Sequence, residues 1–236
     1  MTLIRPKSGL GTRRQPEISR QAIFDAALEE FSLEGVAGGR MDRIATSAGV
    51  NKALLYYYFK DKETLYGALL DHVFSGLLDT VMQAMDKATT PGEQIMAWLA
   101  SHFDYVSHSP SYPRLVQYEM MRANRTGSPH IKRLVSKYFQ PITERLMKAV
   151  EEGIAAGEFR PLNPRHFVSS AVAVITNYFL NVPLMRLAVP GDPLSQERVA
   201  ERRVAVADFV VAALFMPGKS APLPPRVEPA PAQEKE

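Results

Sequence analysis

Apolar residues recur at every third or fourth position along most of the chain, a spacing that predicts amphipathic helices. In residues 19–34, for example, Ile23, Ala27 and Phe31 are four apart and fall on one face. Comparable patterns predict further helices over residues 61–87, 90–106, 115–122, 130–153, 165–181 and 196–215. The chain is therefore predicted to be all-α, with Pro141 kinking or splitting the helix that contains it.

Residues 40–59 carry two short helical patterns on either side of a Gly-Val turn. Gly49 ends the first pattern, because glycine adopts a left-handed backbone conformation at little cost. Asn51 is a favourable cap for the second helix, on which Leu55 and Phe59 share the buried face. Two helices joined by a tight turn are typical of the helix-turn-helix motif, whose second helix enters the DNA major groove. Such helix pairs also occur in helical proteins of other functions, so the flanking sequence has to decide.

The flanking sequence extends the motif to the distinctive run AGV-x5-YYYF-x2-KE-x-L, which begins at Ala48. Residues 18–70 resemble the DNA-binding domain of the tetracycline-repressor (TetR) family of bacterial transcriptional regulators, over a little more than a fifth of the chain. The matching residues are Ala26, Ala27, Phe31, Gly35, Ile44, Ala45, Ala48, Gly49, Val50, Leu55, Tyr56, Tyr58, Phe59, Lys62, Glu63 and Leu65. The chain departs from the family at four positions of the motif. Arg40 stands where Thr or Ser often caps the first helix, and Asn51 stands where Ser often precedes the second helix. Within the second helix, Ala53 replaces a frequent Gly and Leu54 a frequent Thr or Ser.

The resemblance implies an N-terminal three-helix domain with the helix-turn-helix, joined by a long helix to a C-terminal helical domain for ligand binding and dimerisation. A continuous helix between the two halves would allow one to act on the other. The predicted organisation is a flexible basic arm in residues 1–16, the DNA-binding domain in 17–77, the effector-binding and dimerisation domain in 78–216, and a disordered Pro-rich tail in 217–236.

The net charge of +3 is unevenly distributed along the chain. Residues 1–62 contain ten Lys and Arg against seven Asp and Glu, whereas the remaining residues contain eighteen of each. The whole positive surplus therefore lies with the helix-turn-helix, as binding to the phosphates of a polyanion requires.

The second helix of the motif and its flanks supply the candidate DNA contacts. Lys52 can donate to guanine or to phosphate, Tyr57 can bond a base edge or a phosphate, and Tyr56 can donate its hydroxyl to a phosphate. Lys62 stands at the start of the next helix, where an ammonium and free N–H groups can hold a phosphate. Small and apolar side chains on the same helix can contact a thymine methyl. The predicted DNA-contacting residues are Arg40, Arg43, Thr46, Asn51, Lys52, Ala53, Leu54, Tyr56, Tyr57 and Lys62.

The last two strong helical patterns are apolar on more than one side, so each helix has to be covered on two sides. One cover can be the chain's own core, and the other is most simply a second subunit, giving a four-helix bundle between two copies. The predicted interface residues are Val168, Val172, Ile175, Phe179, Val206, Val210 and Ala213. The pattern leaves open which apolar side of these helices faces the partner subunit and which faces an effector pocket.

An effector pocket is expected between helices of the C-terminal half, lined mostly by apolar side chains with a few polar groups. The candidate residues are Trp98, His102, Tyr105, Tyr118, Met121, Arg122, Tyr138, Asn177 and Tyr178. His102 and Asn177 are favoured, because a polar group on a mostly apolar helix needs a partner. An aromatic or Met residue at helical spacing is otherwise an ordinary core residue. The expected effector is an unidentified, largely apolar small molecule.

The composition argues against several other classes of protein. The chain has no cysteine, no signal-peptide pattern and no apolar run long enough to span a membrane, so a cytoplasmic protein with no membrane partner is expected. It also lacks HExxH, GxSxG and Gly-rich phosphate-loop motifs, and its five histidines show no metal-ligand spacing. No enzymatic activity, metal or cofactor is therefore expected.

Together these observations predict a DNA-binding transcriptional regulator, a homodimeric repressor that a small-molecule effector releases from a palindromic operator. A two-fold dimer on a palindrome supplies the specificity that one motif copy lacks. One alternative is a helical small-molecule-binding protein without a role on DNA, which Ala53 and Leu54 weakly favour. An enzyme is a second and less favoured alternative. The sequence does not distinguish repression from activation.

Overall fold

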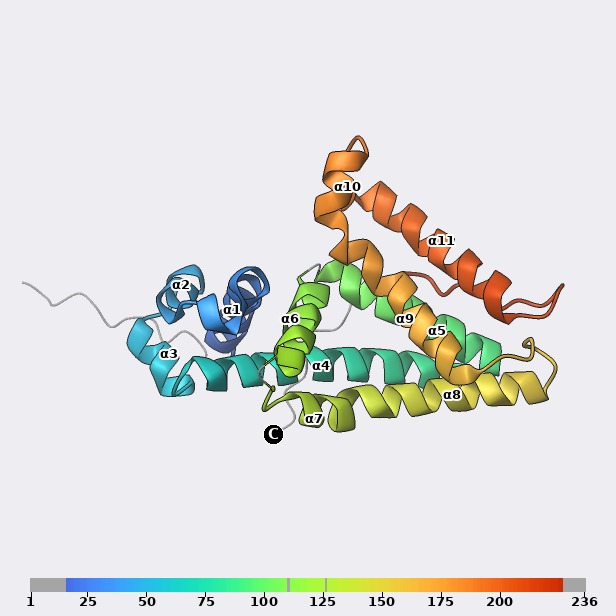
Figure 1. Ribbon diagram of the computed structural model, residues 1–236, viewed down its shortest axis with the longest axis horizontal. Coiled ribbons are helices and arrows are strands. Elements are labelled where there is room, and N and C mark those ends of the chain that lie inside the picture. Colours follow the sequence, from blue (N-terminus) through green and yellow to red (C-terminus); the bar gives the residue numbers. More distant parts are fainter. Residues whose placement is uncertain (1–15, 110, 126, 227–236) are drawn as a thin grey trace, which may run out of the picture. The chain divides into compact units, whose positions relative to one another are not determined.

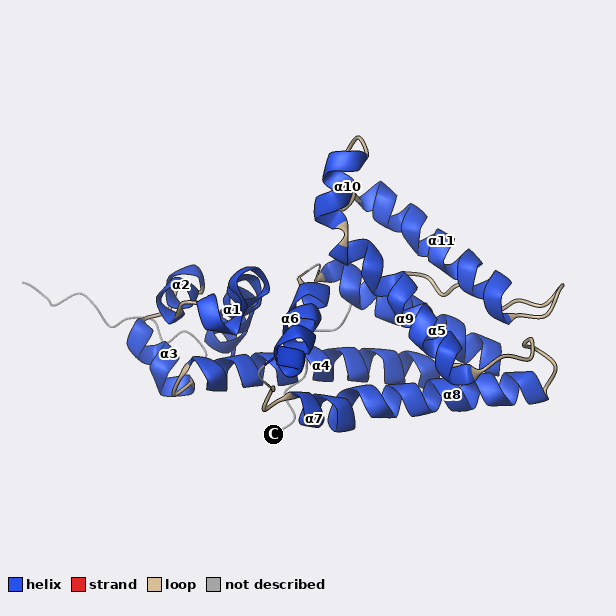
Figure 2. Ribbon diagram, viewed as in Figure 1, coloured by secondary structure: helices blue, strands red, loops and turns tan. Residues whose placement is uncertain are grey.

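The computed structural model describes residues 16–109, 111–125 and 127–226, and this part of the chain consists of helices and loops (Figures 1 and 2). In chain order the helices are α1 (Pro16–Gly38), α2 (Met41–Ser47), α3 (Lys52–Tyr58), α4 (Lys62–Asp86), α5 (Pro91–His108), α6 (Tyr112–Arg125), α7 (Ile131–Leu134), the π-helical turn η1 (Val135–Phe139), α8 (Gln140–Ala155), α9 (Pro164–Leu180), α10 (Val182–Ala188) and α11 (Gln196–Leu214). The predicted all-α fold class is confirmed.

The chain divides into two compact units, the first ending at Leu65 and the second beginning at Tyr66. The division falls near the start of α4, whereas the sequence placed the boundary at residue 77; the predicted domain limits remain a prediction. Apart from Pro16, which begins α1, the predicted basic arm lies outside the described residues.

The core of the first unit is formed by the apolar faces of its helices, as their spacing predicts. Ile23 and Phe31 of α1, Ile44 of α2 and Leu55 of α3 are all completely buried. Inside α1, Gly35 has φ 64° and ψ 173°, which breaks the helical path at the residue where the sequence predicted its end. The left-handed backbone of a glycine thus turns the chain from α1 towards the helix-turn-helix.

In the second unit, α5 packs against α8, α9 and α11 (Figure 1). It begins with a capping box, in which Thr90 accepts a hydrogen bond from the Glu93 amide and Glu93 accepts one from the Thr90 amide. Most of the helix is buried, and Phe103 contacts Phe179 of α9 with 5.5 Å between ring centroids. The interior of this unit is therefore organised around α5.

The helix predicted over residues 130–153 is interrupted, as its proline suggested. The π-helical turn η1 precedes α8, and Pro141 lies in the first turn of α8, where a missing N–H costs little. Elsewhere the structure contains a helix that the sequence did not predict. The helical patterns predicted no helix between residues 181 and 196, but α10 (Val182–Ala188) lies there, and the loop that follows starts after Ala188.

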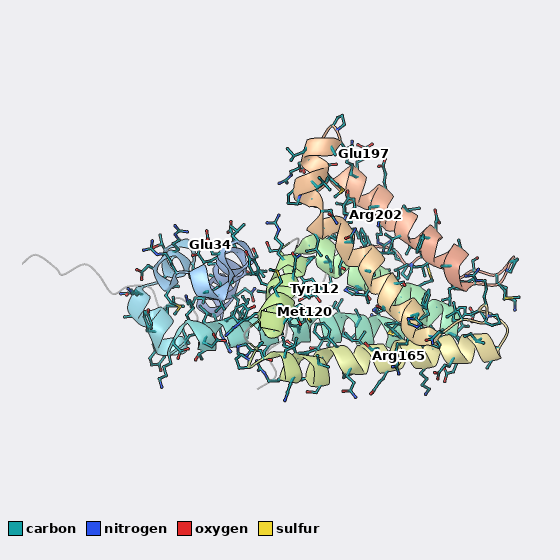
Figure 3. The ribbon with its side chains drawn as sticks, in the orientation of Figure 1. Glu34, Tyr112, Met120, Arg165, Glu197 and Arg202 are labelled. Carbon is teal, nitrogen blue, oxygen red and sulfur yellow. The ribbon has the colours of Figure 1, made fainter. Side chains whose placement is uncertain are left out.

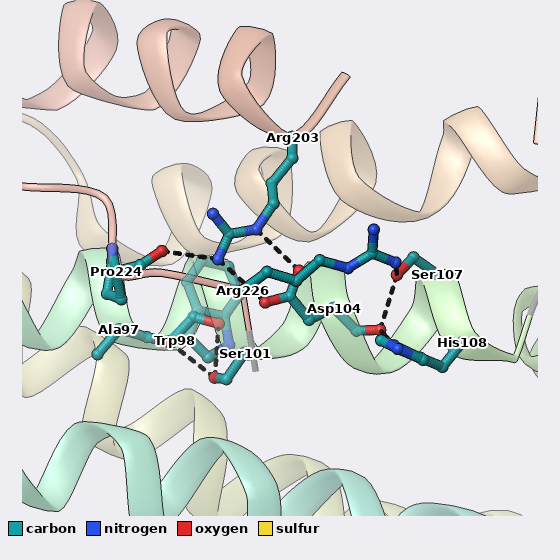
Figure 4. Close-up of polar contacts among 9 residues, drawn as sticks. All are labelled: Ala97, Trp98, Ser101, Asp104, Ser107, His108, Arg203, Pro224 and Arg226. Atoms are coloured by element: carbon teal, nitrogen blue, oxygen red, sulfur yellow. Dashed lines mark hydrogen bonds and ion pairs between the residues drawn. The ribbon is translucent and has the colours of Figure 1, made fainter. Parts of the chain in front are cut away.

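A buried ion pair joins α5 to α11 and holds the chain beyond α11 (Figure 4). Arg203 donates from Nε and Nη2 to the two carboxylate oxygens of Asp104, at 2.8 and 3.0 Å, and also donates to the carbonyl of Pro224 at 2.8 Å. Ala221 is buried as well. The prediction of a disordered tail is therefore wrong for residues 217–226, because buried side chains far away in sequence bind this segment. Residues 227–236 lie outside the described residues.

Candidate nucleic-acid interface

The turn between α2 and α3 has the geometry that its sequence predicts. Gly49 has φ 63°, and the amide of Val50 donates to the carbonyl of Ala45 at 3.0 Å. The Asn51 side chain accepts a hydrogen bond from the amide of Ala53 at 2.9 Å, so the predicted cap of α3 is confirmed. These bonds fix the direction in which α3 leaves the turn.

One side of α3 is anchored in the core and the other is open to solvent. Leu55 is completely buried, whereas Tyr56 is 44% and Tyr57 82% exposed. Tyr57 packs edge-on against Tyr58, which in turn lies 6.3 Å from the ring of Phe59. Ala53 is exposed and Leu54 half-buried. An aromatic surface held by core contacts therefore faces solvent on α3, as a recognition helix requires.

Lys52, the first residue of α3, is held by a carboxylate of α2. Its Nζ lies 2.6 Å from Oδ1 of Asp42 and 6.0 Å from the ring centroid of Tyr56. The hydrogen bond and charge of Lys52 lower the pKa of Asp42, and the same contact raises the pKa of Lys52. Both side chains are more than half exposed, so the pair lies on the open surface.

The polar residues of α2 face the acids of α1 and their own helix. The guanidinium of Arg43 lies 3.9 Å from Glu30 and 3.8 Å from Glu34, while the backbone amide of Arg40 donates to Glu30. The hydroxyl of Thr46 donates to the carbonyl of Asp42 at 2.9 Å. The guanidinium of Arg43 is more than half exposed and ion pairs of this length are weak, so Arg43 can exchange its partner for a phosphate.

Lys62 was predicted to contact phosphate, but the structure gives its ammonium another role. Nζ donates to the carbonyls of Ala37 at 2.7 Å and Gly39 at 3.0 Å, and thereby ties the end of α1 to the start of α4. Side-chain contacts across a distance of more than twenty residues are not visible in a helical pattern. The DNA contact of Lys62 remains a prediction.

Several of the predicted contact residues meet in one groove of about 400 Å³. Its lining residues are Gly39, Arg40, Met41, Asp42, Lys52, Tyr56, Asp61 and Lys62. Asp61 accepts a hydrogen bond from the amide of Thr64, which lowers the pKa of its carboxyl and caps α4. The groove combines three cationic side chains with two carboxylates, a mixture that sequence reasoning missed because it considered only the cations.

The predicted effector-pocket residues of the second unit fall into three groups. The hydroxyls of Tyr105, Tyr138 and Tyr178 donate to Val73, Asp71 and Pro193, respectively, and Arg122 lies over the ring of Tyr66. Tyr118, Met121 and Asn177 are exposed. Trp98 and His102 are buried together, with ring centroids 5.6 Å apart. Within the described residues, Nε1 of Trp98 and both ring nitrogens of His102 make no hydrogen bond.

The predicted dimer stripe lies mostly inside the chain's own core. Val168, Ile175, Phe179, Val206 and Val210 are buried within the single chain, and Val172 and Ala213 are half-buried. The five buried residues pack in the core of the single chain, and their place in a dimer interface stays a prediction. The sequence could not decide between the stripes, because both are apolar.

The opposite side of the same helices is exposed. Val204 and Phe209 of α11 are 52% and 55% exposed, and Ala173 and Asn177 of α9 are exposed as well. On α11, Arg202 (labelled in Figure 3) donates to the carbonyl of Val174 of α9 at 3.0 Å.

The described residues contain no group of three or more His, Asp and Glu side chains that could hold a metal ion. No single helix among them is long and apolar enough to cross a membrane; α9 and α10 pass that test only together, and they meet at a 59° bend.

The capped turn, the exposed aromatic face of α3 and the adjoining groove define a helix-turn-helix DNA-binding protein with a second, helical unit. Residues 23–69 match the family described as "Bacterial regulatory proteins, tetR family", and residues 91–210 match "Tetracyclin repressor-like, C-terminal domain". The chain belongs to the TetR family of bacterial transcriptional regulators. It is accordingly a DNA-binding transcriptional regulator.

Curated relatives and solved structures agree with this assignment. The chain is 29% identical to the HTH-type transcriptional repressor SCO4008 of Streptomyces coelicolor, over 75% of this chain and 86% of the relative. It is 27% identical to the HTH-type transcriptional regulator RutR of Escherichia coli, over 78% and 84%. The ketosteroid transcriptional regulator KstR2 of Mycobacterium tuberculosis has the same fold, with a TM-score of 0.66 over 84% of this chain and 95% of that one, at 18% identity.

Proposed function

We propose that this protein is a homodimeric repressor that binds a palindromic operator and leaves it when a small-molecule effector binds the second unit. The observation that carries the proposal is the solvent-facing side of α3, where Tyr57 is 82% exposed and packs edge-on against the half-buried Tyr58. A relative in Streptomyces coelicolor is named a repressor, which supports the direction of control.

On DNA, α3 enters the major groove and the residues of α2 contact the flanking backbone. Lys52 and Tyr57 carry polar contacts to base edges, and Ala53 and Leu54 contact thymine methyl groups. Arg40, Arg43, Thr46, Asn51, Tyr56 and Lys62 are assigned to phosphate contacts and to the positioning of the motif. One motif reads only a few base pairs, so two copies are needed for a specific site.

The second copy is supplied by a homodimer formed through the exposed side of α9 and α11. Val204 and Phe209 of α11 are large apolar residues that the single chain leaves exposed, and a second copy packed on α11 would cover apolar surface of this kind. The two helices of each subunit would form a four-helix bundle about a two-fold axis. Size-exclusion chromatography with light scattering tests this: Phe209→Glu is expected to give monomers, and a dimer unchanged by it would contradict this interface.

The effector is proposed to bind beside Trp98 and His102. A buried hydrogen-bonding group without a partner costs about 1–3 kcal/mol, so three neighbouring unpaired nitrogens favour a ligand that pairs with them. Burial lowers the pKa of His102 to about 4, so its imidazole is neutral at pH 7 and offers one donor and one acceptor. Apolar residues such as Leu99 and Phe103 are buried on the same helix. These features fit a largely apolar molecule that carries a carbonyl, hydroxyl or carboxylate group.

The decisive experiment is selection of DNA by the purified full-length chain from a library of genomic fragments, followed by sequencing of the bound fraction. Enrichment of a common palindrome is expected, with half-sites about one helical turn apart. Recovery of fragments without a shared sequence would refute the operator proposal. It would favour the alternative of a helical small-molecule-binding protein without a role on DNA.

A further inference from the structure

Asp42 is a carboxylate on the surface that has to approach the phosphates of DNA. It lies in the first turn of α2, and its side chain is 54% exposed in the groove that also contains Lys52. A negative charge at this place is repelled by the DNA backbone unless a cation neutralises it. Its presence beside the recognition helix therefore needs an explanation.

Stability of the fold does not supply that explanation. The Asp42–Lys52 contact is short, at 2.6 Å, but both partners are more than half exposed. Exposed ion pairs contribute little to stability, because water screens them and two side chains lose freedom. The effect of the pair is instead on the lysine, whose ammonium is confined between the Asp42 carboxylate and the ring of Tyr56, 6.0 Å away.

We propose that Asp42 is a positioning residue for operator specificity. It holds the Lys52 ammonium in the position from which it contacts a base edge, and it weakens binding to DNA that offers only phosphates. Lysine is a point charge on a flexible stem, which otherwise turns to the nearest phosphate. An ammonium has three donors, so Lys52 keeps its bond to Asp42 and still donates to guanine O6 or N7. The pair then acts as one neutral, directed donor.

On non-operator DNA the Asp42–Lys52 pair lowers the affinity. Lys52 reaches a phosphate only by leaving Asp42, and the carboxylate then faces the DNA without its partner. Non-specific binding depends almost wholly on neutralised phosphates, so it loses the contribution of one cation. Specific binding keeps its base contact and loses less. Asp42 thereby raises the ratio of operator affinity to non-specific affinity without touching DNA itself.

The Asp42→Asn variant removes the charge and keeps the shape of the side chain. Release of Lys52 to a phosphate should steepen the slope of log affinity against log salt on non-specific DNA by about 0.9. We expect affinity for a scrambled duplex to rise about three- to tenfold at low salt, and the ratio of operator to scrambled affinity to fall about tenfold. The Asp42→Glu variant keeps the charge but moves the carboxylate, so the ratio should fall while the salt slope stays close to that of wild type.

Binding is measured by fluorescence anisotropy with the full-length protein. One duplex is selected by the wild type from a random library, and a scrambled duplex of equal length serves as non-specific DNA. The salt concentration is varied between 50 and 200 mM KCl (about the range in which such slopes are read). Asp25→Asn is the matched control, because it removes an equal charge from an exposed residue of α1 that accepts a hydrogen bond from Gln21 of its own helix. It should leave the ratio unchanged. In a Lys52→Ala background, Asp42→Asn should no longer alter the ratio.

Three results would overturn the proposal: an unchanged ratio in Asp42→Asn, an equal change in Asp25→Asn, or an Asp42→Asn effect that persists without Lys52. Should Asp42→Asn fail to fold, an unchanged ratio in Asp42→Glu would contradict the proposal equally well. The inference rests on operator binding, and the two failures are distinguishable. A wild-type protein that selects no sequence refutes the operator, whereas a selective wild type with an unaffected Asp42→Asn variant refutes only the role of Asp42.

Discussion

His102 should make the protein less stable in mild acid, by an amount that follows from its burial. Burial lowers its pKa from 6.5 to about 4. A histidine with a depressed pKa binds protons more weakly in the folded chain than in the unfolded one, so its protonation favours the unfolded chain. Its full contribution to stability is therefore present above pH 6.5 and is lost as the pH falls towards 4.

The size of the effect follows from proton linkage. Each unit of pKa difference corresponds to a little more than about 1 kcal/mol, so the complete loss below pH 4 is about 3 kcal/mol. At pH 5, between the two pKa values, the same relation gives a loss of about 2 kcal/mol. Carboxylates titrate in the same range, so the informative quantity is the difference in this loss between wild type and a variant without the imidazole.

The His102→Phe variant keeps an aromatic ring beside Trp98 and removes the titrating group. Urea unfolding at pH 7.5 and 5.0 (about one unit above and between the two pKa values) can be followed by the emission of Trp98, the only tryptophan of the chain. Wild type should lose about 2 kcal/mol more than His102→Phe between these conditions. His166→Asn, which replaces an exposed histidine, should behave as wild type. Equal losses in wild type and His102→Phe would refute the burial argument.

Three further changes probe other contacts. Asp104→Ala leaves Arg203 buried without its carboxylate and should cost about 3–5 kcal/mol in urea unfolding; a cost below about 1 kcal/mol, typical of an exposed pair, would contradict the buried pair. Asn51→Ala removes the cap of α3 and should lower the stability of the first unit by about 1 kcal/mol, measured by thermal unfolding, and no change would show that the cap is dispensable. Lys62→Met should weaken DNA binding without changing its salt slope if the ammonium serves only the carbonyls of Ala37 and Gly39, whereas a slope smaller by about 0.9 would show a phosphate contact.

Local chemistry made the helix-turn-helix predictable from sequence. Gly49 needs a left-handed backbone, Asn51 caps the helix that follows it, and Leu55 lies on a face that only a core can accommodate. All three depend on residues within a few positions of one another. The same holds for the interruption before Pro141, which follows from the missing N–H of proline.

Contacts between distant residues were not predictable in this way. The buried Ile175 and the exposed Phe209 belong to helices that are both apolar on more than one side, so only the packing of α9 and α11 on α5 decides which residues are buried. The ordered segment up to residue 226 depends on Arg203, which lies more than twenty residues before Pro224. The Asp42–Lys52 pair joins α2 to α3 across the turn, and the angle between these two helices cannot be read from the spacing of apolar residues. The sequence did contain one signal for the pair, which is the acidic residue in the first turn of α2.

Two copies of the α3 surface are proposed to bind one palindrome. Anisotropy titration of the full-length protein on the selected duplex, compared with a duplex in which one half-site is scrambled, tests this proposal. The two-copy account predicts that loss of one half-site weakens binding at least about a hundredfold, because a mismatched base pair costs about 1–3 kcal/mol and several are lost at once. It also predicts that Tyr57→Ala reduces the difference between the two duplexes. Equal affinity of the wild type for both duplexes would contradict it.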